Sequence, residues 1–157
     1  MVIVDAQSVK NTDTAQIKGY DAGKKVSGIK RHIGVDTNGL PHAITVTAAS
    51  VTDRNGALEL FREKKEILLS VKKVLVDGGY SGTPFAEKVL ELIEAEVEVA
   101  KRNELHMFAV IPKRWVVERS FAWLEKCRRL WKNCERLLLS SIAMIQIVFI
   151  RILLKRS

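Results

Sequence analysis

Two apolar runs in this sequence lead to an aspartate. Residues 1–7 place Asp5 after Val-Ile-Val, and residues 72–80 place Asp77 after Val-Leu-Val and before two glycines. Each run is typical of a short buried strand with a carboxylate at its end. If the two strands are parallel neighbours, their spacing of about 4.8 Å sets the carboxylates side by side. Carboxylates that close repel each other unless a cation lies between them, and Mg²⁺ (or Mn²⁺) is the ion that we expect.

Glu118 is a candidate third carboxylate. It lies in residues 112–131, where apolar residues recur at helical spacing and Glu118 falls on the polar, mostly basic face. Three carboxylates would hold two metal ions about 4 Å apart, which can activate a water or a 3′-hydroxyl for in-line phosphoryl transfer. Each acid also has a simpler explanation. Asp5 and Asp77 could be turn formers or helix caps, and Glu118 the ion-pair partner of Arg114.

The rest of the pattern predicts the elements that position these acids. Residues 2–5 predict a first strand, and residues 29–36 and 41–48 predict a hairpin around an Asn-Gly turn. A helix then precedes the strand that ends at Asp77, a second helix covers residues 83–94, and residues 96–100 alternate as a further strand. We therefore predict an α/β fold. One mixed sheet, with an antiparallel hairpin and parallel strands, is flanked by helices, and the last third of the chain is helical.

The composition indicates one domain with a polyanionic partner. The chain has 157 residues, 47% of them hydrophobic, and a net charge of +8, which suits a single domain spanning residues 1–157. Residues 101–157 carry 13 Lys and Arg against 4 Asp and Glu. The basic surface therefore comes from the last third. Nucleic acid is the partner that we expect, with an acidic membrane surface as the alternative.

The cysteines and the longest apolar segment favour a cytoplasmic protein. Cys127 and Cys134 lie in a helical pattern, and their seven-residue separation of about 10 Å is too long for a disulfide. Residues 137–154 are apolar but interrupted by Ser140, Gln146 and Arg151. We interpret them as a helix that is buried or covered by a partner, not as a membrane span. We expect no signal peptide and a cytoplasmic location, with the protein on the nucleoid when it binds DNA.

Other residues compete for roles in the site. Asp36 is better explained by the hairpin turn, Asp53 by helix capping, and His32 by an exposed strand position. Trp123 and Trp131 fall on the apolar helix face, and we assign them to the core.

Four longer motifs resemble a known family. They are Val4-Asp5-Ala6-Gln7-Ser8-Val9-Lys10, Gly23-Lys24-Lys25 with Lys30-Arg31-His32, Val76-Asp77-Gly78-Gly79-Tyr80, and Arg114-Trp115-Val116-Val117-Glu118-Arg119-Ser120-Phe121-Ala122-Trp123-Leu124. In this order they resemble the ribonuclease-H-like catalytic part of bacterial DDE transposases of the insertion-sequence-five-like group. The resemblance implies that Asp5, Asp77 and Glu118 are the catalytic and metal-binding triad. It also implies two Mg²⁺ or Mn²⁺ ions with DNA bound, and DNA strand cleavage and strand transfer during transposition.

The resemblance further implies partners and DNA-binding residues. The expected partners are double-stranded transposon ends and target DNA, a second copy of the chain, and an N-terminal end-recognition region from another reading frame, because Asp5 is so near the first residue. For Lys24, Lys25, Lys30 and Arg31, an equally good explanation is that these charged residues only make the protein soluble. The DNA-binding candidates are Lys24, Lys25, Lys30, Arg31, Arg114, Arg119, Lys126, Arg129 and Lys132.

The chain departs from the Tyr, Arg, Glu, Lys signature of related transposases at two positions. Arg114 and Glu118 match it, whereas Ile111 stands at the tyrosine position and Glu125 at the lysine position, with Lys126 one place later. Two other functions stay open. One is an inactive, truncated DNA-binding remnant that regulates an intact transposase, and the other is a nuclease of the same fold without strand transfer.

Overall fold

A mixed β-sheet forms the centre of the molecule. The computed structural model describes residues 1–100 and 114–155. These residues form a six-stranded sheet in which five strands have the order β2-β3-β1-β5-β6. The sixth strand, β4, pairs with a different part of β3 than β2 does. The β1–β3 and β3–β4 pairs are antiparallel, whereas the β1–β5 and β5–β6 pairs are parallel. The strands are β1 (Val2–Lys10), β2 (Gly19–Asp21), β3 (Val26–Val35), β4 (Pro41–Ala48), β5 (Lys73–Val76) and β6 (Glu96–Val99).

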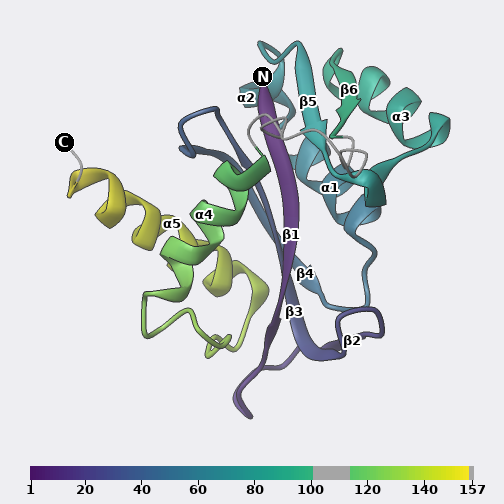
Figure 1. The fold of residues 1–157 in the computed structure, drawn as a ribbon. Helices are drawn as coiled ribbons and strands as arrows, with labels where there is room; N and C mark the ends of the chain where they lie inside the picture. The colour runs from purple at the N-terminus through teal and green to yellow at the C-terminus, as the bar shows by residue number, and fades with distance from the viewer. Residues whose placement is uncertain (101–113, 156–157) are drawn as a thin grey trace, which may run out of the picture.

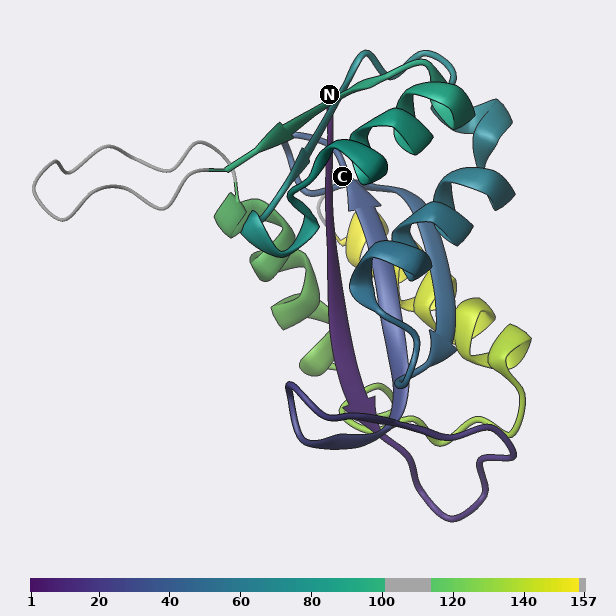
Figure 2. The ribbon, with the colours of Figure 1, turned by 90° about the vertical axis from the view of Figure 1, so that its right-hand side faces the viewer.

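Helices cover both faces of this sheet, as Figure 1 and Figure 2 show. One face carries a core that includes Val4 and Phe61, and the opposite face carries a core that includes Ile3 and Phe149. The helices on the first face are α1 (Asp53–Glu63), α2 (Lys65–Leu68) and α3 (Thr83–Ile93), and those on the second are α4 (Arg114–Glu125) and α5 (Leu138–Leu154). This arrangement confirms the predicted α/β class.

Strand alternation turns both aspartates toward α4. Ile3 and Leu75 belong to the core under α4 and α5, and the residues between them and the aspartates belong to the opposite core. Because successive side chains of a strand point to opposite faces, Asp5 and Asp77 return to the α4 side. The parallel register pairs Ile3 with Leu75. The same offset of 72 residues brings Asp5 level with Asp77, so the predicted parallel neighbourhood of these strands is confirmed.

β1 is longer than we predicted. We expected the first strand to end at Asp5, but it pairs with β3 as far as Lys10. Asp5 therefore lies inside β1, beyond the residues that pair with β5. The short strand β2 was also missed, because residues 8–22 have the polar composition of a loop.

The hairpin between β3 and β4 follows the prediction. Asp36 Oδ1 accepts hydrogen bonds from the backbone N–H groups of Asn38 (2.8 Å) and Leu40 (2.9 Å). Burial raises the pKa of Asp36, but these hydrogen bonds and His42 outweigh it, so the pKa lies below its usual value. Asp36 is the turn residue that we expected, not a member of the site.

The C-terminal helices differ from the prediction in length and burial. The pattern over residues 112–131 predicted one helix, but α4 ends at Glu125 and turns follow it. Trp131 is 60% exposed, so its assignment to the core is wrong, and Trp123 is only half-buried. α5 buries one side, including Ile145 and Phe149. Within the described part of the chain, no helix is long and apolar enough to cross a membrane, and Cys127 and Cys134 are free thiols.

Candidate active site

Asp5 and Asp77 line the same small pocket. β1 and β5 supply most of its wall, and Val117 of α4 closes one side. Both aspartates are half-buried, so their carboxylates lie between the core and solvent. Paired carboxylates in such a place are hard oxygen ligands of the kind that Mg²⁺ takes while it keeps several waters. The donor set at this pocket fits a divalent ion.

Backbone hydrogen bonds orient one oxygen of each aspartate. Asp5 Oδ1 accepts from the N–H of Ala6 (2.8 Å), and Asp77 Oδ1 accepts from the N–H of Gly79 (2.8 Å). Asp77 is the N-cap of a short 3₁₀ turn, η1 (Gly78–Tyr80). Arg54 of α1 holds this turn from outside, because its Nε donates to the Gly79 carbonyl (2.8 Å). The capping explanation of Asp77 therefore applies, and the cap also fixes the carboxylate at the pocket.

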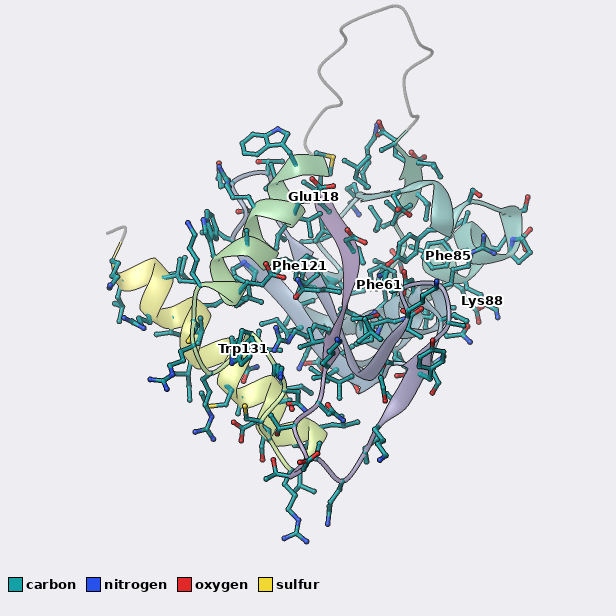
Figure 3. All side chains as sticks on the ribbon, turned by 60° about the horizontal axis from the view of Figure 1, so that its bottom comes forward. Phe61, Phe85, Lys88, Glu118, Phe121 and Trp131 are labelled. Carbon is teal, nitrogen blue, oxygen red and sulfur yellow. The ribbon has the colours of Figure 1, made fainter. Side chains whose placement is uncertain are left out.

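Glu118 lies on the flank of α4 beside β1 (Figure 3). Its neighbour Val117 lines the pocket together with both aspartates, and Glu118 itself is exposed. Among the described residues, no three His, Cys, Asp or Glu side chains are gathered so that they could hold a metal ion. The structure thus brings Asp5 and Asp77 together and places Glu118 next in sequence to Val117, which lines their pocket, and the described residues do not form the three-carboxylate cluster that we expected.

Arg119 clamps α4 to the β3–β4 hairpin. Its guanidinium lies over the rings of Trp115 and Trp123, 4.5 and 4.9 Å from the ring centroids, and its Nη2 donates to the carbonyl of Asn38 (2.8 Å). The two tryptophans stand four residues before and after Arg119, so all three lie along one side of the helix. This stack sets the rotation of α4 and hence the direction of Glu118.

Ser120 and Gly39 complete the clamp. Ser120 Oγ contacts the carbonyl oxygens of Gly39 (3.1 Å) and Val116 (3.0 Å). Gly39 has a φ of +86°, and a Cβ at this position would lie 3.0 Å from Ser120 Oγ and 3.3 Å from Arg119 Nη2. The turn therefore approaches α4 so closely that glycine is needed both for its backbone conformation and for the contact.

Tyr80 is a buried residue of the core on the α1 side of the sheet, near enough to the aspartates to be affected by their charge. It is 1% exposed, packs on Phe85, and its hydroxyl has no hydrogen-bond partner among the described residues. Burial raises the pKa of Tyr80, and the charges of Asp5, Asp53 and Asp77 raise it further. The phenol therefore stays protonated beside the carboxylates. Sequence reasoning gave Tyr80 no role of its own, although it stands three residues after Asp77 in the same motif.

Comparison with known proteins decides the family. A model of the transposase DDE domain matches residues 1–153. This chain belongs to that family. A curated protein from Burkholderia cepacia, assigned as the transposase of insertion sequence element IS402, is 35% identical in an alignment of 116 positions that covers 69% of this chain and 54% of that protein. The insertion-sequence-five-like group stays a prediction.

A solved structure supports the fold of this DDE domain. A chain of the simian T-cell lymphotropic virus intasome, solved in complex with the PP2A regulatory subunit B56 gamma, aligns with a TM-score of 0.58 at 13% identity. The alignment covers 92% of this chain and 45% of that chain. The chain spans about half the length of each of these two relatives.

The basic residues before β4 occupy different environments in the DDE domain. Lys24 Nζ donates to the carbonyl of Ala6 (2.9 Å), the residue after Asp5, and its side chain is 42% exposed. Lys30 is buried, where its Nζ pairs with Asp53 (2.8 Å) and Asp21 (3.1 Å). Lys24 therefore remains at the edge of the site. Lys30 instead joins β2, β3 and α1, and its burial does not fit the phosphate contact that we expected.

Asp21 and Asp53 have structural partners. Burial raises the pKa of Asp21, but hydrogen bonds from the Ser8 hydroxyl, the Lys24 N–H and the Lys30 ammonium outweigh burial and lower the pKa well below its usual value. Asp53 was expected to cap α1, yet the cap is Thr52, whose side chain accepts from the N–H of Asn55. The capping explanation of Asp53 is wrong, because its carboxylate pairs with Lys24 and Lys30.

Arg31 is the most deeply buried cation of the candidate set. It is 1% exposed, and its Nη2 donates to the carbonyl of Leu130 (2.7 Å). Burial lowers the pKa of Arg31 to about 10, against the opposing charge of Glu125. Glu125 in turn accepts from Gln7 Nε2 (2.7 Å). Arg31 therefore holds the segment after α4 onto the sheet, and its burial does not fit a direct DNA contact.

Of the remaining candidates, Lys25 precedes β3 and the others lie on or after α4. Lys126 is exposed, Arg129 Nε pairs with Glu135 (2.8 Å), and Lys132 Nζ lies 4.6 Å from the centroid of the Trp131 ring. Lys25 is exposed. The side chain of Arg114, and Ile111 at the tyrosine position of the signature, lie outside the described residues.

His32 is not the exposed strand residue that we expected. It is 0% exposed, and its Nε2 lies 2.9 Å from Thr47 Oγ1. A Cβ on Gly56 of α1 would fall within 2.0 Å of the imidazole ring, so the glycine is what lets the helix approach the histidine. Burial lowers the pKa of His32 to about 4, against the charge of Asp53. His32 is therefore a neutral core residue behind the site.

Proposed function

We propose that this chain is the catalytic domain of an insertion-sequence transposase that cuts DNA and joins the cut end to target DNA. The observation that carries the proposal is the meeting of Asp5 and Asp77, at the same register and in one pocket beside α4. In the first reaction a water oxygen forms a new bond to phosphorus, and the bond from phosphorus to O3′ breaks. In the second, the released 3′-hydroxyl attacks a phosphodiester of target DNA, and one P–O bond again replaces another.

The candidate residues of this chain would have separate roles in these two reactions. Asp5 and Asp77 would hold divalent ions, and Glu118 would complete the ligand set when DNA fills the pocket. Such ions activate the attacking oxygen and stabilise the leaving oxygen. Lys24, beside the Ala6 carbonyl, would contact a phosphate next to the cut position. Mg²⁺ or Mn²⁺, two ions with DNA bound, is the expected set.

The proposal is tested by nicking of a supercoiled plasmid that carries the DNA flanking the coding sequence. Nicking should require Mg²⁺ or Mn²⁺, and Asp77→Asn should lower its rate by at least about 100-fold, because loss of a supporting residue around a metal already costs about 10- to 100-fold. Glu98→Gln, an exposed acid on β6, is the matched control and should nick normally. Metal-independent nicking, or equal loss in both variants, would overturn the proposal.

Two other functions stay open. The absence of a three-carboxylate group among the described residues favours the first of them. A chain that binds DNA without cutting it would regulate an intact transposase. A nuclease of the same fold would cut without joining. Transfer of a labelled 3′-hydroxyl oligonucleotide into a plasmid supports the first proposal. Nicking without transfer supports a nuclease, and binding with neither reaction supports a regulator.

The wider setting belongs to the same proposal. We expect a homo-oligomer on DNA, double-stranded transposon ends and target DNA as ligands, and a cytoplasmic protein that associates with the nucleoid. Light scattering of the chain with and without duplex DNA measures the change in mass on binding. A complex with one chain per DNA end pair would contradict the oligomer.

A further inference from the structure

A groove with basic residues on its rim lies between α4 and α5. This groove, of about 340 Å³, is lined by cations from the turn after α4 and from the end of α5, over a floor of apolar side chains. The cations are Lys126, from the turn that follows α4, and Arg151 and Lys155 from the end of α5. Val148 and Ile152 form part of the floor. Among the residues that the structure describes, no aspartate or glutamate lines this groove.

The three cations of this groove have no anionic partners in the described part of the chain. None of them takes part in an ion pair with a described residue. All three are exposed, and residues 136–157 contain no Asp or Glu. Arg151 and Lys155 stand four residues apart, a spacing at which like charges repel on a helix. Three unpaired cations around one hollow are suited to an anionic ligand.

The carbonyl end of α5 offers a simpler explanation for two of the cations. Basic residues are favoured in the last turn of a helix, where they interact with the helix dipole. That explanation covers Arg151 and Lys155. It leaves out Lys126, which comes from a different segment and faces the same groove. Cations converging from two elements favour a ligand that spans both.

The groove lies on the other side of α4 from the catalytic acids. α4 packs against both β1 and α5, and Figure 1 and Figure 2 together show the two helices on the same face of the sheet. Glu118 is on the β1 side of this helix (Figure 3), whereas Trp123 and Lys126 line the groove beside α5. Eight residues of helix separate residues 118 and 126, about 12 Å along the axis. A polyanion in the groove would therefore not occupy the pocket of Asp5 and Asp77.

We propose that this α4–α5 groove binds the phosphate backbone of one DNA strand, away from the position that is cut. The inference rests on the proposed function, because DNA is the polyanion that the chain would meet. It adds a second DNA contact surface, which holds DNA while the aspartates act on another part of it. Each unpaired cation replaces a counterion of the DNA, so the groove contributes affinity that falls with salt.

The test compares two triple variants of the full chain. One removes the groove cations (Lys126→Gln, Arg151→Gln, Lys155→Gln). The control removes three exposed lysines of the α2–α3 side (Lys65→Gln, Lys72→Gln, Lys88→Gln), so both variants lose the same charge. Binding of a fluorescent duplex is measured by anisotropy between 50 and about 200 mM salt, a range over which phosphate contacts change affinity strongly.

The groove variant should lower the slope of log affinity against log salt by about 2 to 3, since each phosphate contact contributes about 0.9. The control should change it by less than about 1. Equal slopes in the two variants would overturn the proposal that the groove binds DNA. Loss of binding to phosphatidylserine vesicles with unchanged DNA binding would also overturn it, in favour of a membrane surface.

Two further measurements separate this proposal from the proposed function. Glu98→Gln, the control of the nicking assay, should bind DNA with the slope of the unaltered chain, because it leaves the groove intact. If the unaltered chain binds no DNA, the proposed function itself fails. If the unaltered chain nicks plasmid and the groove variant binds and nicks equally well, only the groove fails. Lys126→Gln alone, with an expected slope change of about 0.9, repeats the test with a single substitution.

Discussion

At the scale of residues, the site depends on two aspartates that the sequence separates by 72 positions. Alternation and parallel register bring Asp5 and Asp77 to the same face and level of the sheet. Both features could be predicted from the residues, because a buried strand has period 2 and an apolar run before glycines ends predictably. The partners of His32 and Lys30 could not be predicted, because they lie in other elements.

His32 gives a packing prediction. Gly56→Ala should destabilise the protein by about 1 to 3 kcal/mol, the cost of overpacking a filled core, because the new Cβ would meet the His32 ring. The better helix propensity of alanine offsets at most about 1 kcal/mol of this. Gly78→Ala, with nothing within 4 Å of its Cβ, is the control. Urea unfolding measures both, and equal stability would show that α1 is not held against the ring.

His32 also predicts how stability depends on pH. Burial lowers its pKa in the folded protein to about 4, while the unfolded chain has the ordinary value of about 6.5. Between pH 4 and pH 6.5 the unfolded chain binds a proton at His32 that the folded protein does not bind. The contribution of His32 to stability is therefore fully present above pH 6.5 and falls as the pH drops toward 4. We expect a loss of about 2 kcal/mol between pH 7 and pH 4.5.

The variant His32→Gln identifies the source of that loss. It removes the titrating ring, so its unfolding free energy should change less than that of the unaltered protein over the same pH interval. Asp21 has a lowered pKa, and the stability that it contributes is lost only below about pH 4, the ordinary value of an aspartate. An unchanged pH dependence in His32→Gln would show that other groups titrate.

At the scale of elements, polar residues with distant partners caused the largest errors in the predicted fold. Gln7 and Ser8 made the end of β1 look like a loop, but Gln7 bonds to Glu125 and Ser8 to Asp21. The ion pairs of Lys30 likewise join β2, β3 and α1. Local composition cannot reveal such pairings, because the partner residues are at least nine positions away.

Lys30 should be more important for stability than its neighbour Lys24. Lys30→Met would leave a half-buried Asp21 without its ammonium partner, and breaking a buried pair in this way costs about 3 kcal/mol or more. Lys24→Met, at a side chain that is 42% exposed, should cost less than about 1 kcal/mol. Chemical denaturation of the two variants gives the comparison. Similar losses would mean that the cluster does not hold β2 and α1 to the sheet.

The Arg119 clamp should control α4 and, through it, Glu118. Arg119→Ala removes two cation–π contacts, each of about 0.5 to 2 kcal/mol, and the bond to Asn38. Arg119→Lys keeps the charge but loses the planar stack. We expect both variants to raise the metal concentration needed for nicking, with alanine the stronger. Ser120→Ala, which removes one neutral hydrogen bond to the hairpin, should have the smallest effect. Unchanged metal dependence in Arg119→Ala would separate the clamp from the site.

At the scale of the whole molecule, the acids and the basic groove lie on either side of α4. The sequence predicted the α/β class, the hairpin and the excess of positive charge in the last third. It did not predict that Lys30 and Arg31 would be buried. Lysine and arginine are usually exposed unless they have partners, and their partners here could not be identified from the sequence. With Lys30 and Arg31 buried, β3 adds little to the basic surface that the charge of the last third predicts.

A manganese-soaked crystal of the chain with duplex DNA tests the central claim most directly, because anomalous scattering locates the metal without ambiguity. We predict a peak within about 2.5 Å of carboxylate oxygens of both Asp5 and Asp77, with Glu118 as a further ligand, directly or through water. A peak bound by other residues, or an empty pocket at saturating Mn²⁺ with DNA in place, would contradict the account.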